Sequence, residues 1–146
     1  MTSLNTSFQE KSTWISLAII LVVFTGYFSQ VFNGLLSDTL SKADTFGLFI
    51  AAVVTVIVLE IVLHIVIAVL DVKDAGHSGD ERDRLFAMKA GNISGWVLGA
   101  AVLMIAINVF VSEPSSIWVA NLLLLAVYVS QVVSYVLQLF YYRRGY

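Results

Sequence analysis

The chain contains no cysteine and few charged residues. Without cysteine it can form no disulfide bond, bind no metal through thiolates and perform no thiol redox chemistry. Asp, Glu, Lys and Arg together make up 12% of its 146 residues, and the formal net charge is only −2. This balance offers no attraction for a polyanion, so we expect no direct nucleic-acid partner.

The common catalytic motifs are absent as well. The sequence has no HExxH, no P-loop, no GxGxxG and no Ser/His/Asp set that could be placed together. Its two histidines, His64 and His77, are about 20 Å apart even on a continuous helix. Tight metal sites normally need three or four ligands in one place. We therefore predict that the chain is not an enzyme and binds neither a metal nor another cofactor.

Apolar residues make up 59% of the chain and gather in four long runs. The runs cover residues 14–36, 46–70, 93–111 and 117–140, and each reaches the roughly 20 residues needed to cross a membrane. The third helix should start earlier than its run, near residue 79, because Ser78 and Glu81 form the pattern of a capping box. The sequence thus predicts an all-α, polytopic integral membrane protein in a single domain, residues 1–146. Its four-transmembrane-helix bundle should have helices at 14–36, 46–70, 79–112 and 115–141.

The positive residues predict the orientation of this bundle, because Lys and Arg resist translocation. Only Lys42 lies in the first connection. If the helices alternate, the remaining seven basic residues share the other side: Lys11, Lys73, Arg82, Arg84, Lys89, Arg143 and Arg144. We therefore expect both termini and the loop 71–78 in the cytoplasm, with membrane lipid around the helices.

Small residues recur at four-residue spacing in the third predicted helix, at Ala87, Gly91, Gly95 and Gly99. In lipid, such residues let helix backbones approach closely. This ladder could pack against another helix of the same chain or against a second copy. Gly26 and Gly34 in the first helix share one face and could supply a matching groove. We expect a homo-oligomer formed through one of these helices.

An ionisable pair, Glu60 and His64, lies one turn apart in the otherwise apolar second helix. Ionisable groups at such a depth normally face the bundle interior and have a partner or a purpose. Counting from the helix starts places Glu60 level with Gln131 and His64 level with Tyr135. The fourth helix carries a polar face on alternating three- and four-residue steps: Asn121, Tyr128, Gln131, Tyr135, Gln138 and Tyr142.

Several interpretations of this buried polar or possible ion or ligand site stay open. Glu60 and His64, with Tyr128, Gln131, Tyr135 and Gln138, could form a purely structural network. They could instead carry a proton- or cation-coupled pathway, since a carboxylate and an imidazole form a natural proton relay. A small-molecule or lipid pocket between the second and fourth helices is a third interpretation. A metal or haem site is the least favoured one, because too few ligands are available.

The segment before the third apolar run is rich in both charges. Asp80, Glu81, Arg82, Arg84 and Lys89 could simply be solvated and cap the helix, or they could contact a soluble protein. Mixed charge of this kind contributes more to the specificity of a protein contact than to its affinity. It is the best candidate in the sequence for a cytoplasmic docking surface.

The same segment carries a resemblance. In the pattern D-E-R-x₆-K-A at residues 80–90, followed by a glycine-bearing membrane helix, the chain resembles a family of uncharacterised small prokaryotic membrane proteins. The resemblance implies a prokaryotic cytoplasmic (inner) membrane. Because members are often found beside small helix-turn-helix regulators, it also implies a cytoplasmic regulatory protein as partner. It implies no activity.

These observations favour a non-enzymatic regulatory or accessory membrane protein whose cytoplasmic loop contacts a soluble partner. One alternative is a small proton- or cation-coupled transporter or channel that uses Glu60 and His64. Another is a membrane sensor that binds a ligand or a lipid.

Overall fold

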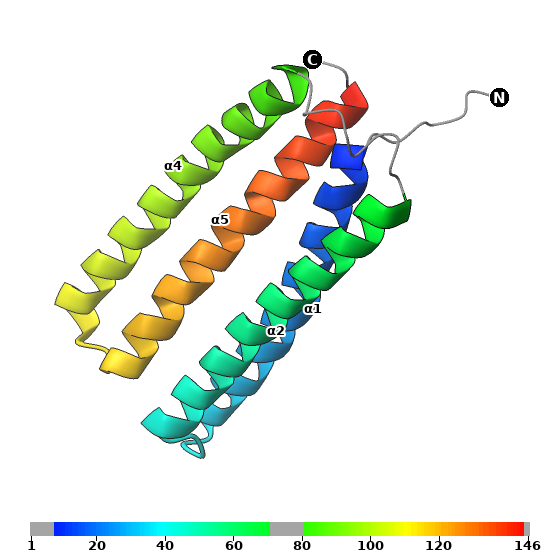
Figure 1. Cartoon of the computed structure of the whole chain (residues 1–146). Helices are drawn as coiled ribbons and strands as arrows, with labels where there is room; N and C mark the ends of the chain where they lie inside the picture. Colours follow the sequence, from blue (N-terminus) through cyan, green and yellow to red (C-terminus); the bar gives the residue numbers. More distant parts are fainter. Residues whose placement is uncertain (1–7, 71–80, 145–146) are drawn as a thin grey trace.

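The computed structural model describes residues 8–70 and 81–144. Over this part the chain is all-helical, with α1 at Phe8–Leu36, α2 at Lys42–Leu70, α4 at Glu81–Ser112 and α5 at Ser116–Arg144 (Figure 1). Each of these four helices is long and apolar enough to cross a membrane. The predicted all-α, four-helix bundle is confirmed for the described residues.

Three helix boundaries lie outside the predicted apolar runs. α1 begins at Phe8 rather than near residue 14, α2 begins at Lys42 rather than near 46, and α5 continues to Arg144 rather than 141. The reason is that an apolar run reports the part of a helix that suits lipid, whereas backbone hydrogen bonding continues into polar turns. A helix of 29 residues, such as α1, is about 43 Å long and exceeds a hydrocarbon core of about 30 Å. The predicted start of the third helix and the loop 71–78 lie outside the described residues.

Hydrogen bonds of its own residues stabilise the connection between α1 and α2. Ser41 and Asp44 form a reciprocal capping box at the start of α2, in which the Ser41 amide donates to Asp44 Oδ2 at 3.0 Å and the Asp44 amide donates to Ser41 Oγ at 3.2 Å. At the end of α1, the Thr39 amide donates to the Gly34 carbonyl at 2.9 Å while Asp38 adopts a φ of 53°. This is a Schellman motif with Asp38 in the left-handed position.

The second connection uses a simpler form of the same ending. Glu113 has a φ of 44°, and its amide donates to the Val109 carbonyl at 3.3 Å. A single bond of this kind, with a left-handed residue directly after the helix, is the αL motif that glycine usually closes. Pro114 follows and cannot continue the helix.

The two short connections make neighbouring helices antiparallel. We call the end that carries residues 37–41 and 113–115 the turn end, and the end that carries Phe8 and Arg144 the terminal end (Figure 1). The main helix pairs of the described residues are α4 with α5, α5 with α1, and α1 with α2. α1 and α5 are therefore the two inner helices, each with two main neighbours, and α2 is not a main neighbour of α5.

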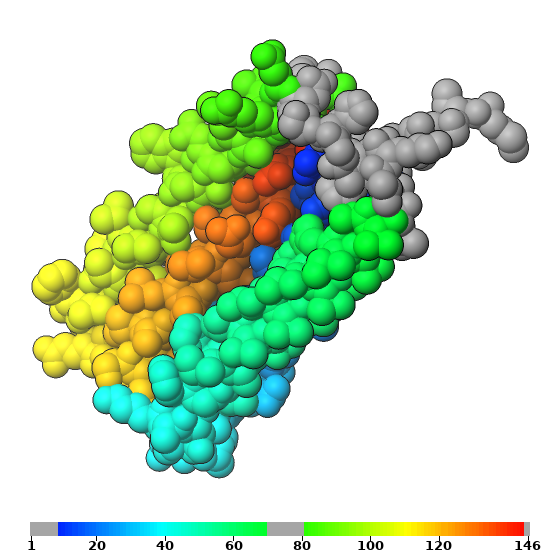
Figure 2. All heavy atoms as spheres, in the orientation of Figure 1, coloured from blue at the N-terminus to red at the C-terminus, as the bar shows by residue number. Residues whose placement is uncertain are grey.

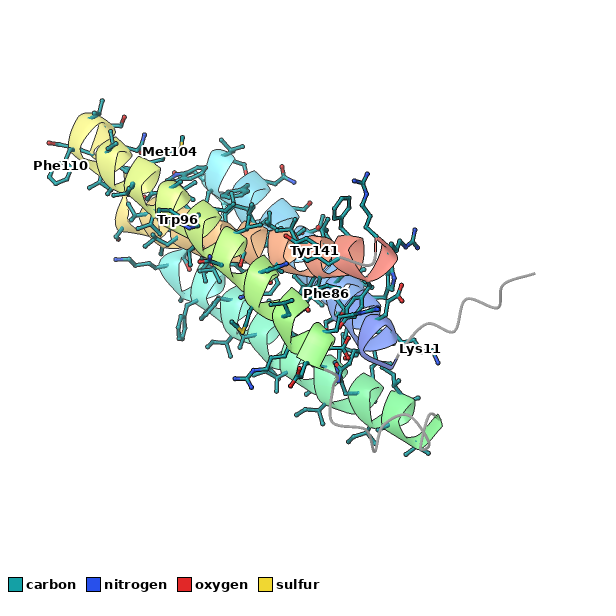
Figure 3. All side chains as sticks on the ribbon, turned by 90° about the horizontal axis from the view of Figure 1, so that it is seen from above. Lys11, Phe86, Trp96, Met104, Phe110 and Tyr141 are labelled. Carbon is teal, nitrogen blue, oxygen red and sulfur yellow. The ribbon has the colours of Figure 1, made fainter. Side chains whose placement is uncertain are left out.

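Two groups of aromatic contacts hold these pairs. Near the turn end, Tyr27, Phe28, Val31 and Ala52 form the buried cluster between α1 and α2, with Tyr128 of α5 packed against it. At the terminal end, Phe86 is fully buried and lies 5.7 Å, between ring centroids, from Tyr141 (Figure 3). Between these groups, the Ser130 hydroxyl donates to the Ser94 carbonyl at 2.9 Å and ties α5 to α4.

Candidate functional site

The ionisable pair of α2 meets two serines of α1. The Ser16 hydroxyl donates to Glu60 Oε2 at 2.9 Å, and Ser12 Oγ lies 2.7 Å from His64 Nε2. His64 Nδ1 lies 2.7 Å from the Glu60 carbonyl and 3.1 Å from Glu60 Oε2. We call these four side chains, together with Tyr135, the Glu60–His64 site.

Helix geometry explains why the four residues meet. Ser12 and Ser16 are four residues apart on α1, as Glu60 and His64 are on α2. Residues at this spacing stack on one face of a helix. Because the two helices are antiparallel, the earlier serine faces the later partner and both pairs form at once.

The site can hold its hydrogen bonds in more than one protonation state. A neutral imidazole needs a donor at one ring nitrogen and an acceptor at the other, whereas an imidazolium donates at both. A serine hydroxyl can rotate between donor and acceptor roles. Ser12 can thus donate to a neutral His64 or accept from a charged one, so a proton can be gained or lost without breaking this contact.

Tyr135 adds α5 to the site. Its side chain lies near Ser16 and is close enough to Glu60 for the two to interact electrostatically. Side chains of α1, α2 and α5 therefore lie near one carboxylate.

The site is half-buried and opens to one side. The side chain of Glu60 is 24% exposed and that of His64 is 37% exposed. Figure 2 shows a furrow between α5 (orange) and α2 (green to cyan), with atoms of α1 (blue) at its floor. This furrow follows from the weak contact between α2 and α5.

The other predicted members of the polar face lie elsewhere. Gln131 is exposed, and Gln138 Nε2 donates to Ser134 Oγ of its own helix at 3.3 Å. Tyr128 Oη lies 3.2 Å from Thr25 Oγ1, nearer the turn end. The structure therefore brings Tyr135 to Glu60 and His64, but not Gln131, Gln138 or Tyr128. The physical reason is that α2 packs on α1 instead of facing α5.

The site predicted from the sequence does not include the two serines. The signal lies in the sequence, since Ser12 and Ser16 repeat the spacing of Glu60 and His64. Ser12 precedes the apolar run that begins at Trp14, whereas α1 itself begins at Phe8 and includes it.

The described residues hold no group of three or more His, Cys, Asp and Glu side chains that could bind a metal ion. Within the site, the ionisable ligands are one carboxylate and one imidazole, supported by hydroxyls. Such a set suits a proton or a weakly held cation better than a transition metal.

The small-residue ladder of α4 faces away from α5. Ala87, Gly91, Gly95 and Gly99 are all exposed, and a Cβ added to any of the three glycines would meet nothing within 4 Å. The residues of α4 that are buried against α5 are Phe86, Ala90 and Ser94 instead. No other part of residues 8–70 and 81–144 thus covers the three glycines of the ladder.

The two glycines of α1 have different surroundings. Gly26 is exposed, and a Cβ there would also meet nothing, whereas Gly34 is buried and a Cβ there would collide with the side chain of Leu40. Gly34 therefore serves the turn after α1. The structure does not bring the glycines of α1 to the ladder of α4, because α1 and α4 are not main neighbours.

The predicted partner-contact residues lie at the terminal end of α4. Glu81, Arg82, Arg84 and Lys89 are exposed, and Asp80 lies outside the described residues. The guanidinium carbon of Arg82 lies 5.4 Å from the centre of the Phe86 ring. Asp83, between these residues, shares a hydrogen bond with Tyr142 of α5.

Comparisons with known proteins add no relative to this picture. No protein-family model, no curated protein and no solved structure matches the chain.

Proposed function

We propose that the chain is a multi-pass protein of a prokaryotic cytoplasmic (inner) membrane, with both termini in the cytoplasm. Four apolar helices support insertion. The distribution of positive charge supports the orientation, because the terminal end carries Lys11, Arg82, Arg84, Lys89, Arg143 and Arg144 and the turn end carries Lys42. Green fluorescent protein fused to the C-terminus should therefore fluoresce, and alkaline phosphatase fused there should be inactive. The reverse pattern would contradict this orientation.

Within that membrane, the chain acts as a proton-responsive regulatory protein. The observation that carries this proposal is the hydrogen bonding of Glu60 to Ser16 and of His64 to Ser12, with Tyr135 close enough to Glu60 for an electrostatic interaction. A carboxylate and an imidazole in contact form a natural proton relay. Because side chains of three helices lie at this site, a change in its protonation can alter how those helices pack.

A regulator is favoured over an open channel by the packing near the turn end. There the aromatic side chains of Phe24, Tyr27, Phe28, Phe32 and Tyr128 contact one another across α1 and α5. They fill the region between the Glu60–His64 site and the turn end. The resulting arrangement is a site reached from one side, which suits a sensor.

The output of the regulator is the charged surface at the start of α4. Glu81, Arg82, Arg84 and Lys89 are exposed and lie at the same end as the predicted loop 71–78. We assign to this surface the contact with a soluble cytoplasmic regulatory protein. The resemblance of residues 80–90 to small prokaryotic membrane proteins supports such a partner.

The test uses two spin labels, one on α2 and one on α5. Because the chain has no native cysteine, Ile65→Cys and Val136→Cys, both at exposed positions, can be labelled without other changes. In nanodiscs, the distance distribution between the labels should differ between pH 5 and pH 8. The difference should disappear in the double variant Glu60→Gln/His64→Gln, in which neither side chain of the pair can change charge, and persist in the matched control Glu113→Gln at the turn end.

Identical distributions at both pH values in the unsubstituted protein would overturn the proposal. Proton flux into dye-loaded proteoliposomes that stops in Glu60→Gln would instead favour the transporter alternative. That alternative draws support from the furrow beside the site (Figure 2).

A further inference from the structure

A pocket lies at the turn end, away from the Glu60–His64 site. It has a volume of about 170 Å³ and is lined by residues of α1, α2 and α5. Lys42, Ser116 and Asn121 contribute polar groups, and Phe46 and Phe49 contribute aromatic walls. We call it the turn-end pocket.

Asn121 is the buried polar residue of this pocket, with 2% of its surface exposed. Its Oδ1 accepts a hydrogen bond from Tyr27 Oη at 2.7 Å, and its Nδ2 donates to the Ile117 carbonyl at 2.9 Å. A side-chain amide has two hydrogens to donate. Nothing in residues 8–70 and 81–144 accepts the second one, so Asn121 has a donor left for a ligand.

Two further donors line the pocket. The Lys42 ammonium and the Ser116 hydroxyl make no hydrogen bond or ion pair within the described part of the chain. Together with Asn121 they form a set dominated by donors, and one of them is charged. Such a set favours an anion, since an ammonium offers no acceptor.

The surrounding backbone adds to the positive potential. α2 begins at Lys42 and α5 begins at Ser116, so two helix N-termini, each carrying positive partial charge, meet at the pocket. The nearest acid in the first turn of α2 is Asp44, which accepts hydrogen bonds from the Ser41 amide and hydroxyl at 3.0 and 2.6 Å and does not line the pocket.

We propose that the turn-end pocket binds the phosphate headgroup of an anionic phospholipid. This inference depends on the proposed membrane insertion, which places the pocket at the depth of the outer lipid headgroups. Phe46 is exposed beside the pocket and offers an apolar surface for the acyl chains. The volume suits a headgroup rather than a whole lipid, so the chains lie outside it, along α2.

Native mass spectrometry of the protein released from nanodiscs tests this directly. The unsubstituted protein should retain phosphatidylglycerol from mixed nanodiscs in preference to phosphatidylcholine. Lys42→Gln should lower this retention about ten-fold, the effect of losing one charge-assisted hydrogen bond. Ser116→Ala should lower it less. Lys89→Gln, which removes an exposed lysine at the opposite end, is the matched control and should leave the retention of phosphatidylglycerol unchanged.

Three outcomes would overturn the proposal. They are unchanged retention in Lys42→Gln, an equal loss in Lys89→Gln, and displacement of the lipid by millimolar inorganic phosphate, which would make free phosphate the ligand. Glu60→Gln separates the two proposals of function. The Glu60→Gln variant should retain the lipid normally even where the proton response is lost. The proposal of lipid binding and the proposal of a proton-responsive regulator can therefore fail independently.

Discussion

At the scale of single residues, Glu60 and His64 each lie beside a serine hydroxyl that can form a hydrogen bond with them. Glu60 receives the Ser16 hydroxyl, and His64 meets Ser12, whose hydroxyl can serve either protonation state. An isolated carboxylate on a membrane helix would cost a few kcal/mol, roughly 3 on insertion scales. Partners on a neighbouring helix reduce that cost, and they also couple the protonation of α2 to the position of α1.

Phe86 offers a residue-scale prediction. Its side chain is fully buried and packs between Tyr141 and Tyr142 of α5, with Arg82 over its ring. Phe86→Ala should destabilise the fold by about 3 kcal/mol, because the truncated side chain leaves a cavity between α4 and α5. The thermal unfolding midpoint in detergent measures this loss.

The matched control lies on the same helix. Phe110 is 88% exposed (Figure 3), so Phe110→Ala removes an aromatic ring of equal size from the surface of α4 and should leave the midpoint nearly unchanged. Equal shifts in the two variants would show that the Phe86 contacts do not hold α4 to α5.

At the scale of helices, the second connection contains a residue poorly suited to its backbone. Glu113 has a φ of 44° directly after α4, a conformation that costs a residue with a side chain roughly 1 kcal/mol. Glu113→Gly should therefore stabilise the fold by about 0.5 kcal/mol, the remainder being offset by the greater freedom of glycine in the unfolded chain. The unfolding midpoint should rise by about 2 °C.

Two comparisons separate this effect from the loss of a charge. Glu113→Ala removes the carboxylate but keeps a Cβ, so it should give no gain. Asp38→Gly should gain less than Glu113→Gly, because aspartate tolerates the left-handed region better than glutamate. A larger gain from Glu113→Ala would mean that the carboxylate, and not the backbone, is unfavourable.

The helices themselves could be predicted from sequence, whereas their neighbours could not. An apolar run of about 20 residues can form little other than a helix in a membrane, because lipid offers no hydrogen-bond partner to the backbone N–H and C=O groups. Which helix lies beside which depends on small differences in packing between similar apolar faces. Counting from helix starts placed Glu60 against Gln131, but α2 packs on α1 and Gln131 is exposed.

The turn-end pocket could not be predicted from the sequence either. Lys42 stood out only as the one basic residue of its connection. That it lies beside Asn121, which is 79 positions away, depends on how α2 and α5 are placed around α1. The Tyr27 hydrogen bond that orients Asn121 is likewise a contact between helices.

At the scale of the whole molecule, α4 has one main neighbour among the described helices. It packs on α5, and its apolar surface elsewhere includes the exposed side chains of Trp96, Met104 and Phe110 (Figure 3). Lipid can cover such a surface. The small-residue ladder beside it, however, suits a helix better than lipid, because the absence of side chains allows close backbone contact. The homo-oligomer expected from the sequence therefore stays a prediction of this face.

Disulfide cross-linking in membranes tests whether this face forms a homo-oligomer. Ala87→Cys should form a disulfide-linked dimer under mild oxidation if the ladder of one copy meets that of another, because the ladder residues would then lie within reach of each other. Adding Gly95→Leu should abolish the dimer by holding the backbones apart. The fold of the single chain should not suffer, since a Cβ at Gly95 meets nothing within 4 Å.

Ile93→Cys supplies the control for random encounters. Ile93 is exposed and, at 100° per residue, lies on the opposite side of α4 from Gly91 and Gly95. A face-specific dimer requires cross-linking at Ala87 and not at Ile93, with loss on Gly95→Leu. Equal cross-linking at both positions would indicate collision in the bilayer, and cross-linking at neither would leave lipid as the cover of the ladder. In that case the proposed regulator would act as a single chain, and the proposed proton response would have to arise from α1, α2 and α5 alone.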